Sequence, residues 1–190
     1  MPPLLPAPEA FAQQAGTLIG KKLTLGKSPP LSIGDARCLA AYINTAGVPC
    51  FVAITDVAFV ASVGAALALM PASVVTEALR TGKPAGALVE NAYEVLNVAA
   101  ALFNDLAGNK IHVKLDRLRV GPIDAAKAAL FAKSAGRVDM SIEIAGYPAG
   151  KLALIAIATA TSAQPAAPAK PPLVPHVTSA WMVWPPRTSG

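Results

Sequence analysis

Residues 86–106 read GALVENAYEVLNVAAALFNDL, and this stretch predicts a long helix that is buried along one side. At about 100° per residue its apolar side chains fall on one continuous face, as packing against a core requires. The residues of this face are Leu88, Ala92, Val95, Leu96, Ala99, Leu102, Phe103 and Leu106. Such a face needs other elements to cover it, so the helix stands at the centre of the predicted fold.

The opposite face of this helix is narrow and polar. It consists of Glu90, Glu94, Asn97, Ala101, Asn104 and Asp105. Glu90 and Glu94 are one turn apart, where like charges repel by about 0.2–0.5 kcal/mol, and no Lys or Arg on this face offsets them. The row is therefore a candidate surface for something outside the chain, with an ordinary solvated face as the alternative.

Length and composition predict one globular domain followed by a tail. The 190 residues are 54% apolar, which excludes a disordered chain for most of the length. From about residue 162 the chain becomes rich in Pro, so we expect a domain over 1–161 and a tail over 162–190. The tail holds Trp181 and Trp184, which are expected to fold back on the domain or to pack on a neighbouring chain. A peptide motif for a partner is the alternative.

Several function classes are excluded by charge and by the rare residue types. The net charge of +5 comes from scattered basic residues, and aromatics make up only 5%, so no nucleic-acid track is expected. Cys38 and Cys50 lack the spacing of a zinc site and are interpreted as core thiols. His112 and His176 stand alone, so no metal site is expected. The first residues lack a signal-peptide pattern, which favours a cytoplasmic protein.

Residues 57–75 form an uncharged run close to the length of a membrane span. The run is rich in Ala, which gains little in lipid, and it is interrupted by Ser62, Gly64, Pro71 and Ser73. Pro71 divides it into a helix over 57–70 and a second helix over 72–81. No membrane span is expected.

The remaining periodicities predict hairpins that alternate with helices. The expected elements are helix 8–21, an extended segment at 23–32, a hairpin of 37–46 and 49–55, strand 110–120 with a change of phase near Asp116, helix 123–133, and a hairpin of 137–145 and 150–160. Hairpins interleaved with long helices predict an α+β fold, with helices packed on one antiparallel sheet.

The last predicted strand, 150–160, is apolar on both faces and needs neighbours on both edges. One domain of this size offers few candidates, so we predict a homodimer that uses a sheet edge or the tail tryptophans. The competing interpretation is a central strand, flanked by 137–145 and one hairpin strand, with the tail covering the domain in cis.

Three stretches carry a resemblance to a known family: GVPCFVAIT at 47–55, the helix predicted after it, and Glu94-Val95-Leu96-Asn97 on the central helix. They resemble the CheC/CheX type of chemotaxis phosphatase. The signature of that family is an acidic or small polar residue followed by ExxN on one long helix, and Glu90 occupies the preceding position. The resemblance covers roughly residues 10–159.

The resemblance implies removal of phosphate from the aspartyl-phosphate of a CheY-like response regulator. It makes Asn97 the residue that orients the attacking water and Glu94 the contact to a lysine of the regulator, with Glu90, Ala101 and Asn104 as partner-binding candidates. An acyl phosphate is already activated, so an amide that holds one water in line supplies the orientation that the reaction needs. The magnesium belongs to the regulator, and none is expected on this chain.

The sequence also departs from the family pattern. Residues 98–101 read VAAA, which is small but apolar where members often carry Gly or another small polar residue. Helix 57–70 has no Glu or Asn, and Glu77 is followed three residues later by Arg80, so one site per chain is possible, as in the CheX-like arrangement. Two other functions stay open: a noncatalytic adaptor or flagellar-switch-like binding protein, and a structural β-sheet dimer.

Overall fold

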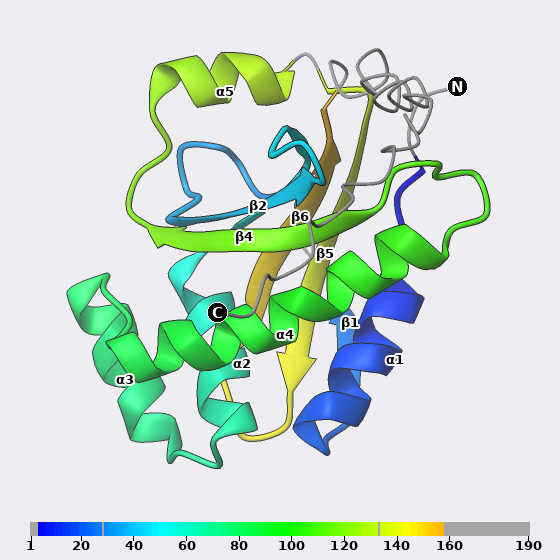
Figure 1. The fold of residues 1–190 in the computed structure, drawn as a ribbon. Coiled ribbons are helices and arrows are strands. Elements are labelled where there is room, and N and C mark those ends of the chain that lie inside the picture. Colours follow the sequence, from blue (N-terminus) through cyan, green and yellow to red (C-terminus); the bar gives the residue numbers. More distant parts are fainter. Residues whose placement is uncertain (1–3, 28, 133, 158–190) are drawn as a thin grey trace, which may run out of the picture.

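An antiparallel sheet runs through the part of the chain that the computed structural model describes, which is residues 4–27, 29–132 and 134–157 (Figure 1). Its strand order is β1-β5-β6-β3-β2-β4. The elements are α1 (Pro8–Ile19), β1 (Leu23–Gly26), β2 (Cys38–Asn44), β3 (Pro49–Thr55), α2 (Val57–Leu67), α3 (Ala72–Thr81), α4 (Gly86–Asp105), β4 (Val113–Val120), α5 (Ala125–Ala132), β5 (Gly136–Ile144) and β6 (Gly150–Ala156). The predicted α+β class and order of elements are confirmed, while the predicted tail with Trp181 and Trp184 lies outside the described residues.

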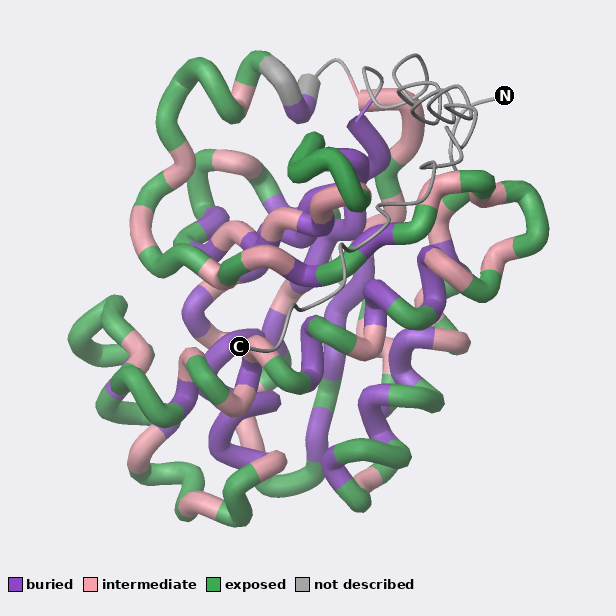
Figure 2. The backbone as a smooth tube through the Cα atoms, viewed as in Figure 1, coloured by how far each residue is buried: buried purple, intermediate pink, exposed green. Residues whose placement is uncertain are grey.

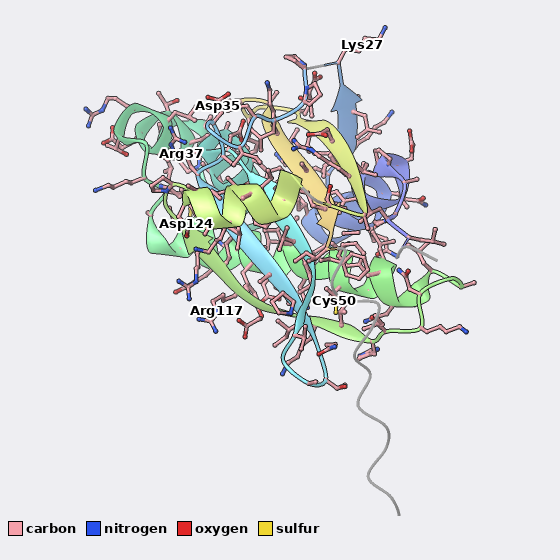
Figure 3. The ribbon with its side chains drawn as sticks, turned by 90° about the horizontal axis from the view of Figure 1, so that it is seen from above. Lys27, Asp35, Arg37, Cys50, Arg117 and Asp124 are labelled. Carbon is pink, nitrogen blue, oxygen red and sulfur yellow. The ribbon has the colours of Figure 1, made fainter. Side chains whose placement is uncertain are left out.

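The two faces of the sheet are covered differently. One face carries the larger core, where α1, α2 and α4 contribute Phe11, Phe59 and Leu96. The other face is covered by residues 29–37 and by α5, which lies on the side away from α4 (Figure 3) and contributes Phe131. Buried residues gather in the central strands and on the inner sides of α1, α2 and α4 (Figure 2). The outer side of α4 is thus left uncovered by the described residues.

The local signals in the sequence predict the turns and caps well. Gly47 and Gly146 turn the two hairpins with φ of +77° and +91°, which favours Gly over other residues. The phase change near Asp116 is a bulge, because Arg117 pairs with Ala41 and Leu115 with Tyr42, which leaves Asp116 without a partner in β2.

Asp56 caps α2 as an oxygen acceptor. Its carboxylate accepts hydrogen bonds from the backbone N–H of Phe59 at 2.8 Å and of Lys151 at 3.1 Å. Burial raises the pKa of Asp56 above its ordinary value, and these N–H donors oppose the rise only in part. The cap therefore holds α2 to the start of β6 at an electrostatic cost.

Several details differ from the sequence-based expectations, among them the strand expected at 23–32, which ends at Gly26. The α2 helix ends at Leu67 and not at Met70, because Leu69 adopts a positive φ of 55°. Leu18 has the core spacing of Phe11 and Ala15 on the predicted helix 8–21, but it is 45% exposed. The expectation that one domain could not supply β6 with neighbours on both edges is wrong. β6 is a central strand flanked by β5 and β3, as the competing interpretation predicted. The predicted homodimer loses this motive and stays a prediction.

Close packing of α2 against α4 places the central helix. A Cβ atom on Gly64 of α2 would lie 2.2 Å from the backbone oxygen of Leu88, so the two helix backbones are nearly in contact.

Among the described residues, none of the helices has the length and apolar character required to cross a membrane.

Candidate functional site

The outer row of α4 is exposed along three turns. Glu90, Glu94, Asn97 and Ala101 are all exposed, while Val95 and Leu96 between them are fully buried. Residues three and four apart lie on the same side of a helix, so the Glu94 and Asn97 side chains are neighbours there. The helix crosses the front of the molecule in Figure 1, and its row faces away from the sheet that α4 packs on.

Three polar side chains of this row have no partner within the described residues. The side chains of Glu90, Glu94 and Asn97 make no hydrogen bond or ion pair there. By contrast, the exposed Glu77 on α3 forms an ion pair with Arg80 at 2.7 Å. One amide and two carboxylates that no other described residue engages are thus available to bind a molecule from outside.

Asn104 differs from the other residues of the row. It is half-buried rather than exposed. Its side-chain amide donates to the backbone oxygen of Val113 at 2.9 Å and accepts from the Val113 N–H at 2.8 Å. These two bonds hold the start of β4 against the end of α4. The structure therefore gives Asn104 a role inside the fold.

Two tyrosine hydroxyls hold the turn of α4 that carries Glu94 and Asn97. Tyr42 on β2 is fully buried and donates to the Leu96 backbone oxygen at 2.9 Å. Tyr93 donates to the Leu115 backbone oxygen on β4, also at 2.9 Å. Burial raises the pKa of Tyr42 far above its ordinary value, so its hydroxyl stays protonated and remains a donor. The turn is thus fixed to two strands of the sheet.

The sequence analysis missed these anchors. Tyr93 and Tyr42 carry no local signal for their roles, because their acceptors lie on elements remote in the chain. In the sequence, Asn104 and Asn97 both lie on the polar face of the same helix. Only the position of β4 in the fold distinguishes them.

The cysteines are buried thiols, as expected. Cys38 and Cys50 are both buried and free, and burial raises the pKa of Cys38 to about 11. In the described part of the chain, no group of three or more His, Cys, Asp or Glu side chains could hold a metal ion.

Comparisons with known proteins place the fold. No protein-family model matches the chain, and no curated protein matches its sequence. Among solved structures, FliY from Thermotoga maritima is similar with a TM-score of 0.52 and 14% identity over 82% of this chain and 93% of its own.

Two further structures are similar at lower scores. CheX in a CheX–CheY–BeF3–Mg2+ complex from Borrelia burgdorferi has a TM-score of 0.46 and 12% identity over 80% of this chain and 98% of its own. CheX from Vibrio vulnificus has a TM-score of 0.48 and 10% identity over 77% of this chain and 91% of its own. At this identity only the fold is compared, and the FliY match and the sheet topology show that the chain has the CheC/CheX-type fold.

Proposed function

We propose that this chain is a phosphatase that hydrolyses the aspartyl-phosphate of a CheY-like response regulator. One observation carries the proposal: Glu94 and Asn97 lie side by side on the exposed row of α4 and are free of partners among the described residues. The fold and the ExxN spacing support it. Glu90 and Ala101 extend the proposed contact surface, and Asn104 supports it by holding β4.

The proposed reaction needs little from this chain beyond orientation. A water molecule attacks the phosphorus atom, the bond from phosphorus to the aspartyl oxygen breaks, and the carboxylate leaves as inorganic phosphate forms and a proton is released. The amide oxygen of Asn97 accepts a hydrogen bond from the water and holds it in line with the bond that breaks. Loss of this orientation is expected to slow the reaction by about 100-fold. The magnesium ion in this proposal is held by the regulator.

Glu94 has a different proposed role. Its carboxylate is exposed and unpaired among the described residues, so it can meet a cation of the regulator without first breaking an ion pair. Glu90, one turn away, adds to the negative field that steers a basic surface toward α4. The hydrogen bonds of Tyr42 and Tyr93 fix this turn of α4 to the sheet, so Glu94 and Asn97 stay in place as the regulator docks.

The test is the decay of a phosphorylated CheY-like regulator with and without this chain. We expect Asn97→Ala to slow the accelerated decay by about 100-fold while regulator binding persists. Asn91→Ala is the matched control, because Asn91 is a half-buried amide of the same helix outside the row. Equal losses in both variants, or full activity in Asn97→Ala, would remove Asn97 from the mechanism.

Glu94→Lys tests the proposed contact separately. The reversed charge meets the expected lysine of the regulator, so affinity falls while the folded state persists. Unchanged affinity together with unchanged turnover contradicts the proposal. A chain that binds the regulator through this row but never accelerates its decay is instead the adaptor that the sequence left open.

A further inference from the structure

A groove lies between α1 and β1, on the far side of the sheet order from β4. Its volume is about 710 Å³. The buried small residues Ala12 and Gly16 line it from the helix, the exposed Gln13 and Thr17 stand at its rim, and residues 21–25 form the opposite wall. The groove is thus bounded by a helix on one side and by an edge strand on the other.

The two sheet edges differ in their protection against pairing. β4 is interrupted by the bulge at Asp116, and it exposes Lys114, Arg117 and Arg119, which is typical of an edge that must not pair. β1 pairs only with β5 among the described residues; Leu23–Gly26 itself contains no charged residue and no bulge, and the exposed Lys22 and Lys27 flank it. An extended peptide can therefore add to β1 and direct alternate side chains toward α1, a geometry used by domains that bind peptides by strand addition.

The chain itself contains a segment suited to this groove. Residues 176–184 read HVTSAWMVW, a run without proline between Pro175 and Pro185, rich in β-branched and aromatic residues. It contains both tryptophans, whose flat side chains cover small residues such as Ala12 and Gly16 well.

The connection is long enough. The described chain ends at Ile157 just after β6. β1 lies two strands away, about 10 Å across the sheet, and its pairing with residues 141–144 of β5 places it about 17–27 Å along the strands from Gly136, the partner of Ala156. Residues 158–175 span about 56 Å when extended at about 3.1 Å per residue. Pro-rich composition favours such an extended spacer over a second folded element.

We infer that residues 176–184 bind in cis along β1, with Trp181 or Trp184 seated in the groove beside Ala12 and Gly16. The sheet then gains a strand beside the uncharged residues Leu23–Gly26, and the groove is filled by side chains of the same molecule. This inference is independent of the proposed phosphatase activity, because α1 and β1 do not contribute to the row on α4.

Tryptophan fluorescence of the full chain tests the inference directly, since Trp181 and Trp184 are the only tryptophans in the sequence. We expect blue-shifted emission and protection from iodide in the folded chain. The double variant Gln13→Arg/Thr17→Arg places two long cations at the rim, and its emission should shift to that of the unfolded chain. The matched control Gln14→Arg/Leu18→Arg changes exposed positions of α1 outside the groove and should leave the emission unchanged.

Backbone pairing has its own measurement. Amide hydrogen exchange in residues 23–26 should accelerate in the full-length variant Trp181→Ser/Trp184→Ser, with far-UV circular dichroism unchanged. The inference is overturned if the unaltered chain shows the emission of exposed tryptophan. It is also overturned if the emission is blue-shifted but stays the same in Gln13→Arg/Thr17→Arg. Emission that shifts on dilution together with a dimer in light scattering also overturns it, because the segment then binds a second copy.

Discussion

Replacing Gly64 by Ala decides whether helix propensity or helix packing controls the position of α4. Propensity alone predicts a gain of about 1 kcal/mol, because Gly is a poor residue inside a helix. The added Cβ atom would lie 2.2 Å from the Leu88 backbone oxygen, whereas real Cβ contacts are essentially never under 3.0 Å. The helices must therefore separate by about 0.8 Å or more, and overpacking of this kind costs typically 1–3 kcal/mol.

We expect the free energy of unfolding of Gly64→Ala to fall by about 1–2 kcal/mol, measured by urea denaturation followed by circular dichroism. Gly86→Ala is the matched control, because Gly86 begins α4 and a Cβ there meets nothing within 4 Å. That control should be neutral or stabilised by up to about 1 kcal/mol. A stabilised Gly64→Ala would refute the close packing of α2 on α4.

Three further outcomes follow from the hydrogen bonds and burial described above. Asn104→Ala should lower the free energy of unfolding by about 1–3 kcal/mol, since two hydrogen bonds to Val113 are lost, whereas Asn97→Ala should change it by less than about 1 kcal/mol in the same urea titration. Because the pKa of Asp56 is raised in the folded state, that state binds more protons, and stability contributed by this carboxyl falls as pH rises from about 3.8 through the folded pKa. Asp56→Asn keeps a neutral capping oxygen, so unfolding curves between pH 4 and 7 should lack that decline; an unchanged pH dependence would contradict it. Cys38, with a pKa of about 11 and no exposure, should resist a thiol reagent at pH 8 until urea is added, and rapid labelling of the folded chain would show that the start of β2 opens.

Local sequence signals predicted most of the elements because their causes are local. The apolar period of residues 86–106 predicts the buried face of α4, and Leu88, Val95, Leu96 and Phe103 are indeed fully buried. The capping residue Asp56 and the turn residue Gly47 act within a few positions of where they stand.

Neighbours that are remote in the chain escaped the same reasoning. The apolar strand 150–160 was compatible with pairing to a second copy and with a central position in one sheet. The apolar pattern alone does not distinguish these two arrangements. Its pairing with β3 and β5 is settled only when the hairpins are assembled into one sheet.

By itself the sequence determined the α+β class, the order of the elements and the polar row on the central helix, since the helical and strand periods need no knowledge of what lies across the core. Only the tertiary structure decided which polar residues of that row lack a partner in the described part of the chain. Asn97 and Asn104 are the same residue type on the same helix, but the start of β4 passes beside Asn104 alone. A hydrogen bond between segments distant in the chain depends on how they pack, and neither segment encodes it separately.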